Sequence, residues 1–197
     1  MKLLVILAHP GPKSFNHAIA KTAVDTLDEL GHDVTFHDLY AEGFDPLLPA
    51  GEMPRDGSVE ETVSRHCAEL SESDGIVVVH PNWWGMPPAV LAGWIDRVFR
   101  PGVAYRFLEG DAGDGVPEGL LRLRSAVVLT TSNTPAARER EVFGDPLARI
   151  WRDCVFGLCG VGAVTRRNYG VVVTSSHEER RGWLADVARL LRDAFPR

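Results

Sequence analysis

Residues 75–99 read GIVVVHPNWWGMPPAVLAGWIDRVF, and this stretch decides how the rest of the chain is interpreted. The apolar run from Ile76 to Val79 is short and unbroken, as is typical of a strand buried on both faces of a parallel sheet. From Pro88 onward apolar residues recur at helical spacing, and proline suits the first helical turn because no hydrogen bond is lost there. The stretch therefore predicts a strand, a loop and a helix.

The loop of this unit carries two adjacent tryptophans, Trp83 and Trp84. Loops at the carboxyl end of a strand in an α/β sheet are where ligands bind. Two interpretations remain open from the residues alone. The indoles either cover the core or a subunit interface, or they offer a flat surface to an aromatic ligand.

The remaining apolar segments alternate between strand and helix patterns. Further strands are expected at residues 2–8, 33–37, 124–130 and 163–173, and helices at 14–30, 58–73, 146–158 and 178–195. A capping box from Ser58 to Glu61 is expected to start the second of these helices. Five strands alternating with helices predict an α/β protein with a five-stranded parallel sheet in the order 2-1-3-4-5, and 197 residues suit a single domain spanning residues 1–197.

Composition narrows the possible partners. The net charge of −6 and the scattered Lys and Arg residues give no electrostatic footprint for nucleic acid or an anionic membrane, so small molecules are the expected ligands. Three cysteines without a Cys-x-x-Cys pair fit reduced thiols in the cytoplasm, and no metal site is expected. No apolar run approaches the roughly 20 residues of a membrane span.

The first loop predicts a phosphate site. Ser14 is a favourable N-cap, and the free N–H groups and dipole of the helix that follows it attract an anion, with His9 and Lys13 as cationic neighbours. The dinucleotide fingerprint Gly-x-Gly-x-x-Gly is absent, which disfavours a Rossmann site. His17, His32, His37 and His66 are expected on the surface or on helix faces.

The chain resembles the NAD(P)H:quinone oxidoreductase family, the DT-diaphorase-like branch of flavodoxin-fold flavoproteins. The resemblance lies in Pro-x-Trp-aromatic-Gly-x-Pro-Ala at residues 81–89, Asp-Arg-Val-Phe at 96–99, Leu-Ala-His-Pro at 7–10, Ser-Phe-Asn at 14–16 and the threonine pair at 130–131. It implies a flavodoxin-like three-layer sandwich and two-electron reduction of quinones by NADH or NADPH through a flavin, in a ping-pong cycle. It also implies a homodimer, because relatives build the acceptor pocket between subunits.

Three loops supply the expected cofactor site. They follow neighbouring strands in the predicted order, so the topology brings them to one edge of the sheet independently of the resemblance. The polar loop after the fourth strand would hydrogen-bond a flavin ring. The cofactor residues expected from these loops are His9, Lys13, Ser14, Phe15, Asn16, Pro81, Asn82, Trp83, Trp84, Gly85, Thr130, Thr131, Ser132 and Asn133.

The substrate side is expected to include Trp84, Tyr105 and Phe107. Residues 103–107 resemble the aromatic segment that lines the family's quinone pocket, often from the partner subunit, and they lie in a glycine-rich excursion at 100–119. The alternative is that Tyr105 and Phe107 only anchor this loop to the core.

The chain departs from the family at several positions. Ser132 and Asn133 replace two glycines, and Phe143 replaces the histidine of a His-Gly-Asp run, with no tyrosine between Thr131 and Phe143. The family's Tyr/His pair, which is thought to stabilise charge on the flavin, is therefore missing, and no catalytic residue is assigned. Backbone N–H groups of residues 131–134, or Arg138 or Arg140, are expected to balance that charge instead.

Two further questions stay open at this point. Ser14-Phe15-Asn16 is most similar to the FAD-binding branch, in which an arginine near Arg180 reaches the adenine, so FAD is expected and FMN is the alternative. A regulatory or electron-carrier flavoprotein, such as a soluble subunit of a potassium-efflux system, is the second functional hypothesis. A colourless flavodoxin-fold protein is the third.

Overall fold

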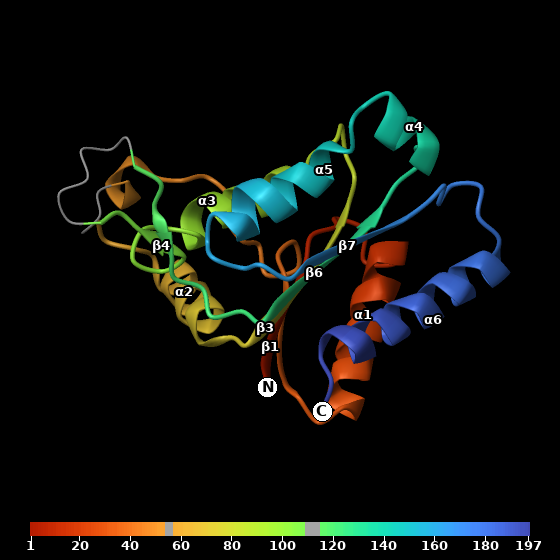
Figure 1. Cartoon of the computed structure of the whole chain (residues 1–197), viewed down its shortest axis with the longest axis horizontal. Coiled ribbons are helices and arrows are strands. Elements are labelled where there is room, and N and C mark those ends of the chain that lie inside the picture. Colours follow the sequence, from red (N-terminus) through yellow and green to blue (C-terminus); the bar gives the residue numbers. More distant parts are fainter. Residues whose placement is uncertain (54–56, 109–114) are drawn as a thin grey trace.

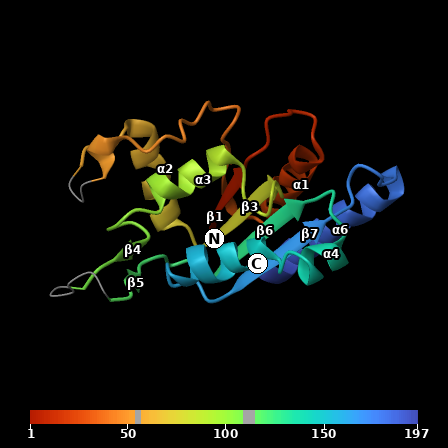
Figure 2. The ribbon, with the colours of Figure 1, turned by 90° about the horizontal axis from the view of Figure 1, so that it is seen from above.

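The computed structural model describes residues 1–53, 57–108 and 115–197 and consists of a parallel sheet covered by helices on both faces (Figures 1 and 2). The sheet order is β2-β1-β3-β6-β7, so the predicted five-stranded order and fold class are confirmed. The strands are β1 (Lys2–Leu7), β2 (Asp33–Asp38), β3 (Gly75–Pro81), β6 (Ser125–Thr131) and β7 (Val164–Tyr169).

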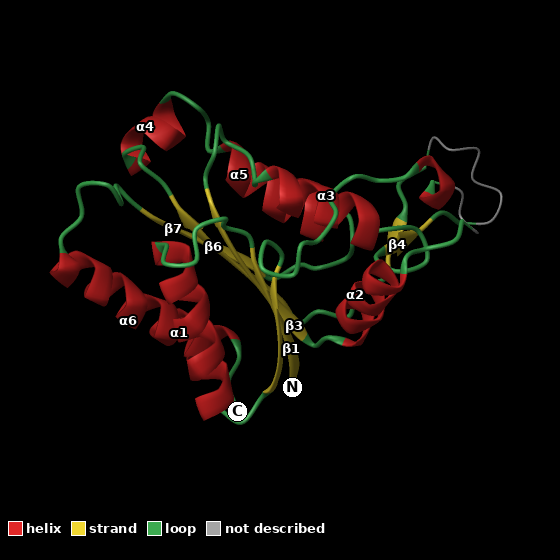
Figure 3. Ribbon diagram, turned by 180° about the vertical axis from the view of Figure 1, so that it is seen from behind, coloured by secondary structure: helices red, strands yellow, loops and turns green. Residues whose placement is uncertain are grey.

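Two helices cover one face of the sheet and a second group covers the other (Figure 3). The first face carries α1 (Phe15–Glu29) and α6 (His177–Ala194), and the second carries α2 (Glu61–Glu72), α3 (Ala89–Val98) and α5 (Pro146–Arg149), which continues as the π-helical segment η2 (Ile150–Gly157). Shorter elements are η1 (Ala50–Glu52), α4 (Ala136–Glu141) and a hairpin of β4 (Tyr105–Arg106) and β5 (Glu118–Gly119).

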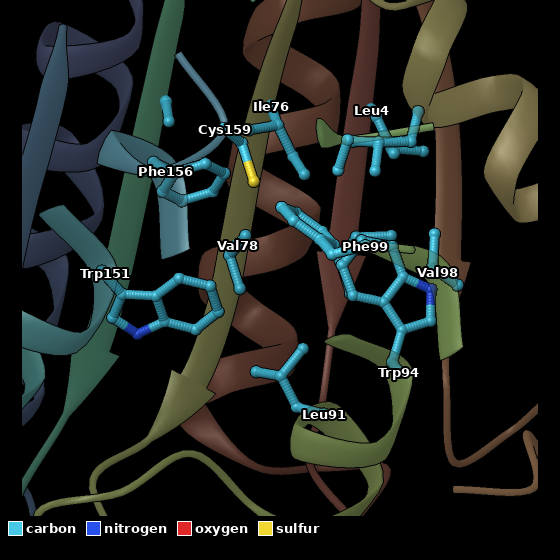
Figure 4. Close-up of a cluster of buried hydrophobic side chains, with 14 of the residues drawn as sticks. Leu4, Ile76, Val78, Leu91, Trp94, Val98, Phe99, Trp151, Phe156 and Cys159 are labelled. Carbon is cyan, nitrogen blue, oxygen red and sulfur yellow. The ribbon is translucent and has the colours of Figure 1, made fainter. Parts of the chain in front are cut away.

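The core is divided by the sheet, because successive side chains of a strand point to opposite faces. In β3, Val77 and Val79 pack with α1 and α6, whereas Ile76 and Val78 pack with the helices of the other face. On that second face Trp94 and Trp151 are fully buried beside the strands (Figure 4). Each fully buried side chain of this size contributes roughly 2 to 3 kcal/mol of hydrophobic free energy.

Several local predictions need correction. Helix α2 begins at Glu61, and Ser58 does not cap it, because Val59 packs against the core and residues 58–60 precede the helix. The fifth strand ends at Tyr169 rather than Val173, since the backbone leaves the sheet there and pairs with the loop after β6. The excursion at 100–119 contains the small β4–β5 hairpin, and its residues 109–114, with Gly110 and Gly113, lie outside the described residues.

None of the helices in residues 1–53, 57–108 and 115–197 combines the length and the apolar character needed to cross a membrane.

Candidate functional site

A pocket of about 350 Å³ lies at the edge of the sheet where β1, β3 and β6 end. The three loops predicted to converge do so, and the loop after β7 joins them. The pocket is lined by His9, Ser14, Phe15, Asn16, Pro81, Asn82, Trp83, Thr131, Ser132, Asn133, Thr134, Val172 and Val173.

Four of the expected cofactor residues lie outside this lining, each for a physical reason. Lys13 is exposed beside the first loop. Thr130 points to the face of the sheet opposite Thr131, and its hydroxyl donates to Asn168 Oδ1 over 2.9 Å. Trp84 and Gly85 belong to a turn that lines a second pocket.

The first loop presents the amino end of α1 to the pocket. Ser14 caps this helix as predicted, because its side chain accepts a hydrogen bond from the backbone N–H of His17. Free N–H groups at a helix start attract anionic ligands. His17 itself is half-buried, contacts Ser14 Oγ through Nδ1 and lies 3.0 Å from Asp38 Oδ2 through Nε2, so it supports the loop rather than lying on the surface.

His9 acts on the pocket as a neutral donor. Its Nδ1 accepts a hydrogen bond from the backbone N–H of Gly11 over 3.0 Å, so the ring proton lies on Nε2. Burial lowers the pKa of His9, which disfavours the charged form. The ring therefore offers one N–H group rather than the cationic partner that the sequence suggested.

The floor of the pocket contains an unsatisfied acceptor. Asn16 is 3% exposed, and its Nδ2 donates to Thr131 Oγ1 over 2.9 Å, which ties the start of α1 to the end of β6. Asn16 Oδ1 has no partner among the described residues. A buried polar atom without a partner costs roughly 1 to 3 kcal/mol. Oδ1 is enclosed in the free protein, so a ligand hydroxyl or N–H group would relieve that cost once it reached this atom.

Trp83 and Trp84 lie in different environments. Trp83 lines the pocket, whereas Trp84 is 95% exposed at the tip of the turn from Trp83 to Met86. Trp84 and Gly85 have φ values of 58° and 74°, which makes the turn of type I′, where Asn-Gly is the usual pair. A tryptophan at positive φ is strained, and such strain is found mainly at functional sites.

Asn82 holds this turn in place. Its Oδ1 accepts from the backbone N–H of Gly85 over 3.0 Å, and its Nδ2 donates to Glu139 Oε1 over 2.9 Å. A Cβ at Gly85 would lie 2.7 Å from Pro146, so the turn packs against the start of α5 without room for a side chain. Asn82 therefore joins the β3 loop to α4.

A second pocket of about 500 Å³ lies on the other side of Asn82. Asn82 and Thr134 line both pockets, so the two adjoin. The second pocket is mainly apolar and is lined by Asn82, Trp84, Gly85, Thr134, Glu139, Phe143 and Pro146. Phe143, which occupies the family's histidine position, thus forms part of its wall.

His80 lies near the end of β3 and supports the loop that follows this strand. Nothing in the sequence singled it out. It is fully buried; its Nε2 accepts from Trp151 Nε1, and its Nδ1 donates to the carbonyl of Pro81 over 2.8 Å. Burial lowers the pKa of His80 to about 4. Because the ring is neutral and both nitrogens are occupied, we assign it a positioning role.

The loop after β7 was missed because the fifth strand was expected to extend through it. Val172 donates from its backbone N–H to Ser132 O, and Val173 donates to Asn133 Oδ1 over 2.9 Å. Asn133, which replaces a family glycine, thus adds a side-chain contact that fastens this loop, whereas Ser132 contributes its backbone carbonyl. Arg180 donates to Val172 O over 2.9 Å and lies 5.9 Å from the ring centre of Phe15, close to the pocket.

Tyr105 and Phe107 are not brought to either pocket within one chain. They lie in and next to β4 with their ring centres 5.8 Å apart, and Tyr105 packs on the core and lines a separate pocket beside Arg97 and Glu52. Of the two arginines proposed for charge balance, Arg140 is exposed and Arg138 lies 5.3 Å from the ring centre of Phe143, also exposed.

Two of the histidines expected on the surface or on helix faces are buried: His66 lies on the inward face of α2 and His37 lies in β2, which corrects the surface position. His37 and His66 stack with ring centres 4.0 Å apart, and both lie within reach of Glu42. Trp94 Nε1 donates to His66 Nδ1 over 3.0 Å, so the neutral ring carries its proton on Nε2, where a metal would need a lone pair. His37 is hydrogen-bonded to Glu42 and Glu69, whereas His66 Nε2 has no hydrogen-bond partner among the described residues. Burial lowers the pKa of His66 to about 3.

The fold and the paired pockets define a doubly wound α/β protein with a ligand site at the carboxyl edge of its sheet. Residues 1–189 match the family described as flavodoxin-like fold, and the chain belongs to that family. Together with the similar proteins named in the next paragraph, this match confirms the resemblance to NAD(P)H:quinone oxidoreductases.

The chain is similar to named members of the same group. The ribosyldihydronicotinamide dehydrogenase [quinone] of Mus musculus is 29% identical over 98% of this chain and 92% of its own length. The ribosyldihydronicotinamide dehydrogenase-like protein traD of Penicillium crustosum is 32% identical over 66% of this chain, which spans only 57% of that protein. The solved NAD(P)H:quinone oxidoreductase from Methanothermobacter marburgensis is 25% identical, with a TM-score of 0.81 over 98% of this chain and 96% of its own.

Proposed function

We propose that this protein is a flavin-dependent NAD(P)H oxidoreductase that reduces quinones or similar electrophiles by two electrons. The observation that carries the proposal is the pocket at the sheet edge, which is lined by Asn16, whose enclosed Oδ1 has no partner among the described residues, and which has the free end of α1 at its side. A flavin nucleotide has the matching chemistry, since it combines a phosphate, a hydroxylated chain and a flat ring. Relatives with quinone reductase names support the same reaction.

The residues of the pocket fit a flavin in three parts. The N–H groups at the start of α1 and the Nε2–H of His9 would hold phosphate, and Asn16 Oδ1 would accept from a hydroxyl or ring N–H. Trp83 would supply flat apolar surface, and the polar loop at residues 131–134 would hydrogen-bond the ring edge. When bound, the flavin takes a hydride from NADH or NADPH and then delivers two electrons to the acceptor.

The second pocket is proposed to take the nicotinamide and the acceptor in turn, which is the requirement of a ping-pong cycle. Trp84 and Phe143 supply its aromatic walls, and its position beside Asn82 places it next to the cofactor pocket. Aromatic walls bind flat rings. Trp84 and Phe143 are exposed in the single chain, so they would exclude water from the transfer step once a ligand or the partner subunit covers them. Within residues 131–134 the N–H groups of Ser132 and Thr134 already donate to Tyr169 O and Ser132 Oγ, so our proposal for balancing charge on the reduced cofactor narrows to the N–H groups of Thr131 and Asn133, since Arg138 and Arg140 are exposed.

FAD is proposed over FMN. Phe15 and Arg180 lie against each other at the rim of the pocket, beside Val172 and Val173, and together they offer an aromatic face and a guanidinium to a second ring system. FMN would leave these groups without a ligand.

A homodimer in the cytoplasm completes the proposal. Tyr105 and Phe107 would reach the second pocket from the partner subunit, and exposed apolar residues near their hairpin, Leu47, Leu48, Met53, Leu108 and Val116, support burial of this region in an interface. The three cysteines are free thiols, as a reducing compartment allows. Sedimentation analysis of the flavin-loaded protein should give twice the chain mass of 21.6 kDa.

The decisive assay combines a spectrum, a mass and kinetics. The purified protein should show flavin absorption bands, release a compound of FAD mass on denaturation, and reduce menadione with NADH or NADPH in parallel-line kinetics. Bound flavin that neither dinucleotide reduces would favour the regulatory or electron-carrier function. A protein that stays colourless after flavin addition would refute both.

A further inference from the structure

The second pocket contains one charged group. Of the described residues that line it, Trp84, Gly85, Phe143 and Pro146 are apolar, and Glu139 carries the only charge. Glu139 lies in α4 and is 4% exposed, which is unusual for a glutamate. Burying a carboxylate in an apolar wall costs free energy unless hydrogen-bond donors contact its oxygens. A glutamate at this position therefore indicates either a structural role or a ligand.

A structural role explains only one of the two carboxylate oxygens of Glu139. Oε1 accepts from Asn82 Nδ2 over 2.9 Å and so helps to hold the turn that carries Trp84. Oε2 makes no hydrogen bond within the part of the chain that the structure describes, and it is not among the fully enclosed atoms. Because Glu139 lines the second pocket, Oε2 is the carboxylate oxygen that remains for a ligand there.

Neighbouring residues stabilise the charge of Glu139 without donating a hydrogen bond to Oε2. Arg166 directs its guanidinium to Asp145, with Nη1 donating to Oδ2 over 3.1 Å. Burial lowers the pKa of Arg166, whereas the charges of Asp145 and Glu139 act in the opposite direction, so Arg166 and Glu139 stabilise each other through space. Arg138 and Glu141 of the same helix are exposed, and their effect in the pocket is screened by solvent.

We propose that Glu139 is a specificity-determining residue of the second pocket: its Oε2 accepts a hydrogen bond from an N–H group, such as a carboxamide, on a flat uncharged ring, and it repels anionic rings. This inference rests on the proposed function, because it concerns the ring that exchanges the hydride. A hydrogen bond to a carboxylate is about twice as strong as one between neutral groups. The carboxamide of a dihydronicotinamide is a substituent of this kind.

The test compares three inert ligands of equal ring size: 2-naphthamide, its methyl ester counterpart methyl 2-naphthoate, and 2-naphthoate. Dissociation constants are measured by NMR titration of the flavin-loaded protein, with the indole N–H of Trp84 as the reporter, assigned from Trp84→Phe. The wild type should bind the amide about tenfold more tightly than the ester, and the carboxylate most weakly.

Glu139→Gln separates recognition from positioning. The Gln oxygen can still accept from Asn82, while its NH₂ replaces the free oxygen, so the amide-to-ester preference should fall to within about twofold of unity. Glu141→Gln removes the same charge from an exposed position of α4 and should keep the wild-type preference. If Glu139→Gln retains the preference, Glu139 only holds Asn82 and the proposal is overturned.

If Glu139→Gln fails to fold, the ratio of the wild-type dissociation constants for the amide and the ester still tests the proposal. Equal affinities for amide and ester, or tighter binding of 2-naphthoate, would overturn the proposal while the protein still binds flavin and is reduced by NAD(P)H. A protein that takes up no flavin would overturn the proposed function and this inference together.

Discussion

Asn16 and Thr131 are 115 positions apart in the chain and are joined by a hydrogen bond of 2.9 Å from Asn16 Nδ2 to Thr131 Oγ1. Both side chains are buried, and the bond fixes the amino end of α1 against the carboxyl end of β6. Asn16 Oδ1, on the other side of the same amide, is enclosed and has no partner among the described residues. The geometry of the cofactor pocket thus depends on one contact between distant segments.

Replacing Thr131 with Val tests this contact. The change keeps the shape and strand propensity of the side chain but leaves Asn16 Nδ2 without its acceptor, so the free energy of unfolding should fall by about 1 to 3 kcal/mol. Flavin affinity should fall as well, because Asn16 is no longer held. Urea unfolding and flavin titration measure the two effects, and Thr165→Val, at an exposed position of β7, is the matched control. Equal behaviour of the two variants would show that the contact is unimportant.

Trp84→Asn should stabilise the fold but weaken the enzyme's use of quinone. Asparagine tolerates the positive φ of this position, and the exposed indole has little packing to lose, so the free energy of unfolding should rise by about 1 kcal/mol. The KM for quinone should rise, because an aromatic wall of the second pocket is removed. Trp84→Phe keeps both the ring and the strain, and it should change neither quantity much. A destabilised Trp84→Asn would mean that the indole packs on the protein.

Acidification should destabilise the fold through His80. The pKa of the buried ring is about 4, below the roughly 6.5 of an unfolded histidine, so the unfolded state binds the proton first. The contribution is complete above pH ~6.5 and is lost as the pH falls toward ~4, a change of about 3 kcal/mol at ~1.4 kcal/mol per pKa unit. Urea unfolding between pH 7 and 4 should show a shallower decline for His80→Gln than for wild type. His177→Gln, at an exposed position, should follow the wild type, and parallel curves for all three proteins would contradict the assignment.

The buried ion pair of Arg97 and Glu52 predicts a large effect of breaking one side. Arg97 is 2% exposed, and its Nη2 and Nε donate to the two oxygens of Glu52 over 2.6 and 3.1 Å. Arg97→Met should lower the free energy of unfolding by about 3 to 5 kcal/mol, because Glu52 is left as an unpaired buried charge. Arg106→Met, which breaks the exposed pair with Glu118, should cost less than about 1 kcal/mol by the same denaturation assay. If the two variants lost similar free energies of unfolding, Glu52 would have to be hydrated once Arg97 is replaced, which would contradict this prediction.

The fold was predictable because its signals are local. Buried parallel strands contain continuous apolar runs such as residues 76–79, and the helices that cover them carry apolar stripes and caps such as Ser14. Errors arose where tertiary contacts override local pattern. Val59 keeps Ser58 out of the helix it was expected to cap, and the pairing of Val172 with Ser132 ends the fifth strand early.

The site was predictable where strand order alone brings residues together. Loops after β1, β3 and β6 meet because parallel strands end at one edge. The role of Glu139 was hidden, because a glutamate in a helix of alternating charges has the pattern of a solvated face, and only the structure shows Asn82 reaching it. His37 and His66 were likewise hidden, since their partners come from other elements of the chain.

A crystal structure of the protein with FAD tests the central claim most directly. We expect the flat ring against Trp83, a donor group of the ligand on Asn16 Oδ1, and phosphate at the amino end of α1. A structure in which this pocket stays empty at saturating FAD, with Trp83 turned into the protein interior, would contradict the account.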